Sequence, residues 1–212
     1  MEADDLGTYV VKYVGAGQGR KTLIAEIICA GLARAVGLRV PELVLVDVDP
    51  DLGRSEPDEE VQDLLRASGG LNLGMDFLPG SLGFDPLAHL IDPVEAATVV
   101  WFDALVGNVD RSWRNPNMLM WHRDLWLIDH GACLTFHHAW ARADGWPTKP
   151  YDVKDHVLRD RATATVAPSL STDQIAAAVA DVPDLWLEGE EGFDSPAGVR
   201  AAYVDLIGRR LG

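Results

Sequence analysis

Side chains with oxygen donors gather at two places in this sequence. Asp110, Asn115 and Asn117 lie in one polar stretch, and Asp129 follows later, directly before His130 and Gly131. Carboxylate and amide oxygens are the ligands that hard cations such as Mg²⁺ prefer. In the general template for phosphoryl transfer, an Asp accepts the hydroxyl proton, an Asn five residues later binds metal, and the Asp of an Asp-x-Gly motif also binds metal. The spacing of these residues follows that template. A simpler alternative is that Asn, Asp and Pro cluster here because they cap turns.

A lysine and a glutamate near the N-terminus point to the same chemistry. Lysine is scarce, yet Lys12 lies between Val11 and Tyr13, in a segment that is otherwise suited to burial. Glu26 follows within an apolar helical pattern. A strand lysine held by a helix glutamate binds phosphates in the kinase template. The alternative is an edge-strand lysine and a solvated glutamate. The joint order of Lys, Glu, linker, Asp…Asn and Asp-x-Gly is rarer than any of its parts and favours phosphoryl transfer.

The first part of the chain is predicted to form a small sheet with one helix. The expected elements are a strand over 8–14 after the turn at 5–7, a helix over 22–36, and strands over 41–47 and 71–77. Any partner preceding the first strand would lie N-terminal to Met1, so the sheet is expected to lack its first strand or two. The acid-rich stretch 47–60 is predicted to be a solvated loop without chemistry of its own.

The second part is predicted to be mainly helical. Asp92-Pro93-Val94-Glu95 is a capping sequence that opens a helix ending near Gly107. A hairpin over 117–129 should turn around Arg123-Asp124, and Ser171 and Ser195 should each open a helix. The Leu78-Pro79-Gly80 segment divides the two parts. We therefore predict an α+β protein of two lobes, with an antiparallel-sheet lobe over 1–78 and a helical lobe over 79–212.

Composition limits the partners of this protein. It has 18 Lys+Arg against 33 Asp+Glu, a net charge of −15, which disfavours nucleic acid. Cys29 and Cys133 are too few for a disulfide scaffold or a four-ligand zinc site. The sequence shows no membrane-spanning apolar run and begins with acidic residues, unlike a signal peptide. A cytoplasmic protein with no membrane partner is expected.

Three segments together resemble the HipA-like kinase family, whose catalytic loop is similar to that of phosphatidylinositol 3-/4-kinases. They are Tyr9-Val-Val-Lys12, the stretch from Glu26 to Leu38-Arg-Val-Pro41, and Gly107-Asn-Val-Asp110-Arg111. The resemblance covers roughly residues 8 to 138. It implies a protein-kinase-like fold, ATP and Mg²⁺ as ligands, and a hydroxyl acceptor, with a protein Ser or Thr favoured over a lipid because no basic membrane-facing patch is seen.

The resemblance also implies a role for each candidate residue. Lys12 would bind the α- and β-phosphates, and Glu26 would orient it. Asp110 would be the catalytic base, with Asn108 bracing its loop. The implied hinge against adenine is Met75 to Leu78, including Phe77. The implied Mg²⁺ ligands are Asp129 and an asparagine, either Asn115 by spacing or Asn117 by its place at the start of a strand.

Two departures from the family pattern affect the catalytic loop and the metal motif. Ser112 stands where the resembling loops carry His, so the loop should be held differently. His130 replaces the Phe of Asp-Phe-Gly, which should change packing more than metal binding. The glycine-rich segment 15–21 follows the lysine strand instead of preceding it, so we interpret it as a connection. With these departures, a nucleotide-binding regulatory module without turnover, a pseudokinase, is the alternative function.

A metallohydrolase is a further alternative. His122, His130, His137 and His138 lie in the same half of the chain as Asp110 and Asp129. However, no Asp-x-His pair occurs upstream to supply a first metal site. We predict that His137 and His138 form a surface pair.

Overall fold

The computed structural model describes residues 1–17 and 19–211, without the side chain of Ser55. The class is α+β, as predicted. The elements in chain order are β1 (Tyr9–Lys12), α1 (Arg20–Ala35), β2 (Leu43–Val48), the 3₁₀ helix η1 (Pro50–Ser55), α2 (Glu59–Ala67), β3 (Gly70–Asp76), β4 (Leu82–Gly83), α3 (Pro93–Val106), β5 (Met118–Trp121), β6 (Asp124–Leu127), η2 (Thr135–His138), η3 (Trp140–Gly145), α4 (Thr172–Ala180), α5 (Asp184–Leu187) and α6 (Pro196–Leu211).

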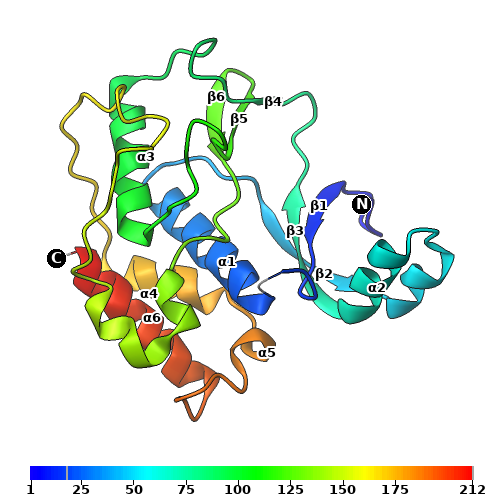
Figure 1. Cartoon of the computed structure of the whole chain (residues 1–212). Helices are drawn as coiled ribbons and strands as arrows, with labels where there is room; N and C mark the ends of the chain where they lie inside the picture. The colour runs from blue at the N-terminus through cyan, green and yellow to red at the C-terminus, as the bar shows by residue number, and fades with distance from the viewer. Residues whose placement is uncertain (18, 212) are drawn as a thin grey trace.

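The first sheet is antiparallel with the order β1-β3-β2 and lies beside α1 (Figure 1). Lys12 is opposite Leu73 in β3, which is opposite Leu45 in β2. Because side chains alternate between the faces of a strand, Val10 and Lys12 share the face of Leu73, which is buried in the core. This face therefore presents Lys12 toward α1.

The second sheet has the order β4-β5-β6 and is also antiparallel. His122 and Arg123 form its two-residue turn, with φ of 50° and 73°. Two consecutive left-handed residues are typical of a tight hairpin turn. Asp124 already pairs with Trp121, so the turn lies one residue earlier than predicted.

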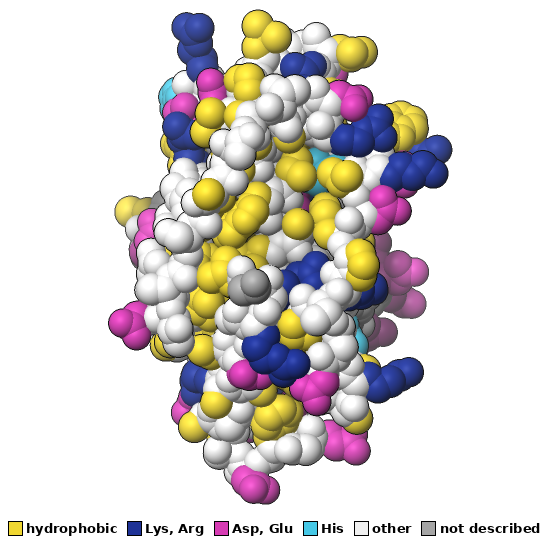
Figure 2. Space-filling model, turned by 90° about the vertical axis from the view of Figure 1, so that its left-hand side faces the viewer, with side chains coloured by type: hydrophobic (Ala, Val, Ile, Leu, Met, Phe, Trp, Pro, Cys, Tyr) yellow, Lys and Arg dark blue, Asp and Glu magenta, His cyan; other side chains and the backbone are white. Residues whose placement is uncertain are grey.

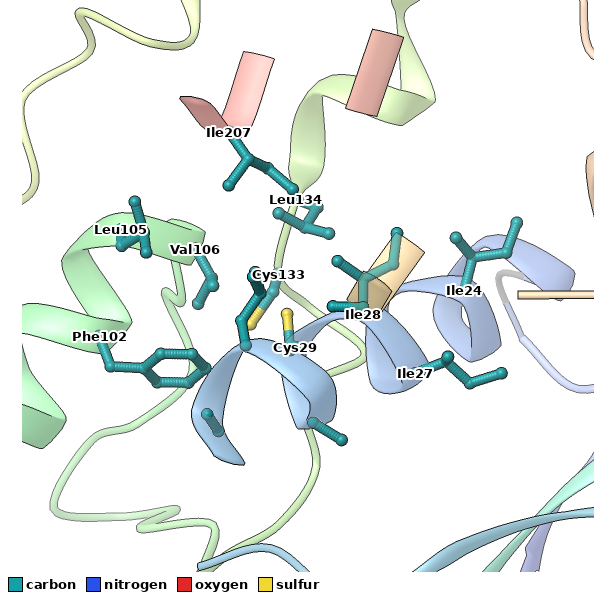
Figure 3. Close-up of a cluster of buried hydrophobic side chains, with 14 of the residues drawn as sticks. Ile24, Ile27, Ile28, Cys29, Phe102, Leu105, Val106, Cys133, Leu134 and Ile207 are labelled. Carbon is teal, nitrogen blue, oxygen red and sulfur yellow. The ribbon is translucent and has the colours of Figure 1, made fainter. Parts of the chain in front are cut away.

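Helix α1 forms the centre of the core. Its apolar face packs against side chains of α3, α6 and the segment after β6 (Figure 3). The labelled members of this cluster are Ile24, Ile27, Ile28, Cys29, Phe102, Leu105, Val106, Cys133, Leu134 and Ile207. Since this core includes side chains from both halves of the chain, α1 can hold residues of the first sheet against residues of the second hairpin.

The prediction of a solvated loop over 47–60 was wrong. The segment contains η1 and the start of α2. Asp58 caps α2 by accepting from the amides of Glu60 and Val61, and Glu59 lies in the first turn. Acidic side chains are favourable at a helix N-terminus, so here they mark the start of a helix. The side chain of Leu65 is buried and marks the inward side of α2.

The face on the side of α3 and the C-terminus carries a band of hydrophobic side chains down its middle (Figure 2). Lysine and arginine side chains lie beside this band, and acidic ones lie mainly at the margins of the view. Among the described residues, no helix has both the length and the apolar character needed to cross a membrane.

Candidate active site

Lys12, Glu26 and Asp129 are in direct contact, although they come from distant parts of the sequence. Lys12 ends β1, Glu26 lies in α1, and Asp129 follows β6. The Lys12 ammonium bonds to Glu26 Oε1, and it lies 2.6 Å from Asp129 Oδ1. The structure therefore brings together the lysine, the glutamate and one of the two acids singled out by the sequence.

The ionisation of this cluster is set by its own charges. Burial opposes the charged form of Lys12, but the Glu26 and Asp129 carboxylates outweigh it and raise the lysine pKa. Burial likewise opposes ionisation of Glu26, whose side chain is 4% exposed. The adjacent His130 ring and the Lys12 ammonium reverse that effect and lower the pKa of Glu26 to about 2. Glu26 is therefore a carboxylate at neutral pH.

Local backbone geometry and packing shape the Asp129-His130-Gly131 motif. Asp129 is left-handed, with φ of 59°, a conformation that Asp tolerates better than most residues. His130 is buried, with its Nδ1 3.7 Å from Glu26 Oε2 and its ring against the edge of Phe102. A Cβ on Gly131 would lie 2.3 Å from Thr22 Cγ2. The glycine thus allows α1 to approach Asp129 closely.

The Asp110 carboxylate lies between two asparagines. Its Oδ2 accepts from Asn115 Nδ2 at 3.1 Å and from Asn117 Nδ2 at 3.2 Å. The Asp110 amide donates to Asn108 Oδ1 at 3.0 Å. The backbone of Asn117 accepts from the Ile128 amide at 3.0 Å, directly before Asp129. Asn117 therefore connects Asp110 with the chain that carries Asp129.

A buried ion pair lies behind the loop that carries Asp110. Arg111 Nε donates to Asp103 Oδ2 at 2.6 Å, and neither side chain is exposed. Arg111 also donates to the Asn117 carbonyl, and its Nη2 lies 3.3 Å from His130 Nε2. Because an arginine can only donate, His130 Nε2 accepts, which leaves the ring hydrogen on Nδ1, toward Glu26. A continuous buried polar chain thus joins the loop to the Lys12 cluster.

The predicted hinge lies at the end of β3. Met75 pairs with Val10 and Leu43, and the amides of Asp76 and Phe77 already donate to the carbonyls of Glu42 and Thr8. Leu78 is buried, and no acceptor for its amide occurs among the described residues. Of the predicted hinge amides, that of Leu78 is the one left for a ligand.

The glycine-rich segment does not bring its lysine to the site. Lys21 instead bonds to the His137 carbonyl and, at 2.6 Å, to Glu190 Oε1. Gln18 of this segment lies outside the described residues. The prediction of a surface histidine pair was wrong for His137, which is buried with its Nδ1 2.8 Å from the Tyr203 hydroxyl. The prediction failed because two adjacent polar residues suggested an exposed position.

The donor set suits a hard cation that also binds phosphate oxygens. Asp110 accepts from Asn117 Nδ2, and the Asn117 carbonyl accepts from the Ile128 amide directly before Asp129, so these carboxylate and amide groups come from connected segments. Within the described part of the chain, no group of three or more His, Cys, Asp or Glu is arranged to hold a metal ion.

Sequence reasoning missed two buried polar residues that hold the site, Asp103 and His156. Asp103 stands between Phe102 and Ala104 in the otherwise apolar stretch 99–106, and a charge in such a pattern indicates a buried partner. His156 lies in an irregular segment, and no sequence signal connects it with the catalytic loop.

A two-sheet α+β fold that brings together a strand lysine, a helix glutamate and the Asp of an Asp-x-Gly motif is the arrangement expected for a phosphotransferase. The chain matches the family model of HipA-like kinases over residues 2–207. It therefore belongs to the HipA-like kinase family, and the match extends beyond the segments on which the resemblance was based. Neither the curated proteins nor the solved structures include a match to the chain.

Proposed function

We propose that this kinase transfers the γ-phosphoryl group of ATP to a hydroxyl, with a Ser or Thr of a protein as the acceptor, and that it depends on Mg²⁺. The observation that carries the proposal is the contact between Lys12 of the first sheet and Asp129 of the second hairpin. Asp110 is linked to the same segment through Asn117, whose side chain donates to Asp110 and whose carbonyl accepts from the Ile128 amide. On this proposal Lys12 would supply the cation for the phosphates, Asp129 and Asn117 the metal ligands, and Asp110 the base. A cytoplasmic location, where ATP and Mg²⁺ are available, accords with this activity.

The nucleotide would lie on the face of the first sheet that carries Lys12. Val10, two residues before Lys12, is 44% exposed on this face and offers apolar surface to the purine. The Leu78 amide can donate to the edge of adenine, and the Lys12 ammonium can reach the phosphates. The buried Glu26 carboxylate keeps Lys12 charged and oriented.

Asp129 and Asn117 are the better pair of metal ligands. Asn117 is 8% exposed and its carbonyl accepts from the Ile128 amide, whereas Asn115 is exposed. Each asparagine directs Nδ2 toward Asp110, so the Oδ1 atom of Asn117 is left for a cation. Bound Mg²⁺ would neutralise charge between the β- and γ-phosphates.

Asp110 is positioned to take the acceptor proton. Its Oδ2 already accepts two amide hydrogens, and Oδ1 accepts no bond from the described chain. The acceptor oxygen would bond to the γ-phosphorus, its proton would pass to Asp110, and the bond from phosphorus to the β-phosphate oxygen would break to release ADP.

A polypeptide acceptor accords with the surface around Asp110. Val109 is 75% exposed and Trp113 is 65% exposed, on either side of Asp110 in the sequence. The Arg114 guanidinium lies 4.9 Å from the centre of the Trp113 ring. Apolar surface with a flanking cation beside the base is suited to contacts with a protein segment.

One observation favours the pseudokinase alternative. The ammonium needed by phosphates and the carboxylate needed by Mg²⁺ neutralise each other in the Lys12–Asp129 pair. This pair must loosen before both ligands can bind productively. A module that binds nucleotide without turnover could keep the Lys12–Asp129 ion pair.

The deciding experiment compares wild-type protein with Asp110→Ala. We expect ATP with Mg²⁺ to raise the melting temperature of both proteins, and ADP release by the variant to fall about 10²–10⁴-fold, because a general base contributes that much. Asp63→Ala, which removes a surface carboxylate of α2, is the matched control and should keep wild-type turnover.

Each result of this comparison has a clear meaning. Thermal stabilisation of wild-type protein without ADP release would support the pseudokinase. No stabilisation and no consumption of ATP would reject both functions. Full activity of Asp110→Ala would reject Asp110 as the base.

A further inference from the structure

The irregular segment 151–158, here called the tether, crosses behind the loop that carries Asp110. The Tyr151 hydroxyl donates to the Asn108 carbonyl at 2.9 Å, and the Val157 amide donates to the Arg111 carbonyl at 3.2 Å. Ser112 and His156 form an antiparallel bridge. The tether therefore contacts the loop on both sides of Asp110.

His156 is the buried side chain of the tether, and both of its ring nitrogens are used. Nδ1 accepts from the Leu158 amide at 3.0 Å, so the neutral ring carries its hydrogen on Nε2. Nε2 then donates to Asp103 Oδ2 at 2.9 Å. The ring is thereby fixed in one tautomer and one orientation.

Asp103 receives this bond at the centre of the loop support. Its Oδ2 is shared by His156 and Arg111, and its Oδ1 accepts from Asn108 Nδ2 at 2.9 Å. Burial opposes ionisation of Asp103, but Arg111 and His156 outweigh it and lower the pKa. The buried carboxylate thus stays charged and has both oxygens occupied.

The orientation of Asp110 depends on Asp103 through one intermediate. Asn108 donates to Asp103 and accepts from the Asp110 amide, while Arg111 joins Asp103 to the Asn117 carbonyl. If the Asp103 side chain turned away, Asn108 and Arg111 would both lose the carboxylate that fixes their positions. Displacement of a reacting group by about 1 Å can cost about 10²-fold in rate.

We propose that His156 is a positioning residue for the phosphoryl transfer, acting on Asp110 through Asp103 and Asn108. It contacts neither the nucleotide-binding face nor the Asp110 carboxylate, so its effect is on geometry. The proposal rests on the proposed kinase activity, and its test therefore includes a measurement that does not need turnover.

Two amide substitutions separate the two nitrogens of His156. His156→Asn places an acceptor near the position of Nδ1, which keeps the Leu158 contact but loses Asp103. His156→Gln places an N–H donor near the position of Nε2 and keeps the Asp103 contact. His137→Leu removes a buried histidine outside the network and serves as the control for a general loss of stability.

Two quantities are measured under conditions where each variant is folded, namely amide hydrogen exchange across residues 107–117 and the steady-state kcat and KM for ATP. For His156→Asn we expect exchange of the Asp110 and Ser112 amides to rise about 10-fold or more. We also expect kcat to fall about 10- to 100-fold, with KM for ATP within about threefold of wild type. His156→Gln should recover most of both losses. His137→Leu should change neither.

Several results would overturn the proposal. If amide exchange across residues 107–117 in His156→Asn equals that of wild type, the proposal is wrong, whether or not the protein is active. It is also wrong if this exchange rises while kcat is unchanged. If amide exchange of the loop rises as much in His137→Leu as in His156→Asn, His156 contributes only to general stability. If His156→Asn does not fold, His156→Gln decides alone, since loss of exchange protection and kcat there would contradict a role for the Nε2 donor. Raised exchange in a protein whose wild type never consumes ATP would reject the kinase activity and leave the loop support standing.

Discussion

The two acids of the site are held in different ways. Asp110 lies on a loop supported by Asp103 and Arg111, whose side chains are fully buried and bonded within the chain. Asp129 has a half-exposed side chain and depends on a single ion pair with Lys12. One half of the site is fixed before any ligand arrives, and the other half keeps charges that a ligand can reach.

This difference corresponds to the different tasks proposed for the two halves. A base works best when its position is set in advance, because the geometry of proton transfer is demanding. A residue that binds metal and phosphate must exchange its partners as the ligands enter. In the proposed function Glu26 would make that exchange possible, because Lys12 would keep one carboxylate partner if Asp129 turned to a metal.

The largest effect on stability should come from breaking the buried half. Asp103→Ala would leave the Arg111 guanidinium buried without its carboxylate, which is expected to lower the free energy of unfolding by about 3–5 kcal/mol. Asp129→Ala removes a half-exposed carboxylate and should cost less than about 1 kcal/mol. Urea unfolding of the two variants measures this difference.

Asp103→Asn tests whether the charge itself matters, because it keeps the shape and changes the charge facing Arg111. The free energy of unfolding of Asp103→Asn should lie between those of wild type and Asp103→Ala. Similar losses for Asp103→Ala and Asp129→Ala would show that the two acids contribute equally to stability and would remove the contrast.

The second prediction concerns acid and the residue that serves both halves. The pKa of Glu26 is lowered from 4.5 to about 2 in the folded protein. Its ionised form therefore contributes stability that is complete above pH 4.5 and is lost as pH falls toward 2. The linkage amounts to about 3 kcal/mol in total, of which about 2 kcal/mol is lost between about pH 6 and about pH 3.

Urea unfolding at these two pH values measures the loss. Wild-type protein should lose about 2 kcal/mol more than Glu26→Gln over the interval. Glu95→Gln is the control, because burial raises the pKa of Glu95 and the difference from wild type should have the opposite sign. An equal loss in wild type and Glu26→Gln would mean that Lys12 and His130 do not stabilise the Glu26 carboxylate.

Local signals allowed much of the fold to be predicted. Capping at Asp92 and Ser171 located α3 and α4, and alternating apolar residues located the strands. The spacing of Lys12, Glu26, Asp110 and Asp129 indicated a shared site, and three of these residues, Lys12, Glu26 and Asp129, are in contact. Their order along the chain could be read against a known reaction template, so no knowledge of the packing was needed.

The parts that could not be predicted depend on contacts between distant segments. The departure at Ser112 left open how the loop is held, and the support comes from His156, whose segment has no regular pattern. Acid-rich composition concealed α2, because acids favour a helix start as well as solvent. Burial of His137 depends on Tyr203 in the last helix, which a local reading does not include.

The smallest predicted effect tests the packing on the Asp129 side. Gly131→Ala would place a Cβ 2.3 Å from Thr22 Cγ2, so α1 or the motif must shift, at an expected cost of about 1–2 kcal/mol in unfolding free energy. Thr22→Ser removes that methyl group, and the double variant should recover most of the loss in a double-mutant cycle. Gly145→Ala meets no atom within 4 Å and should stay within about 0.5 kcal/mol of wild type. Additive losses from Gly131→Ala and Thr22→Ser would show that the glycine is not needed for the approach of α1, and the position of Asp129 would then depend on its ion pair with Lys12 alone.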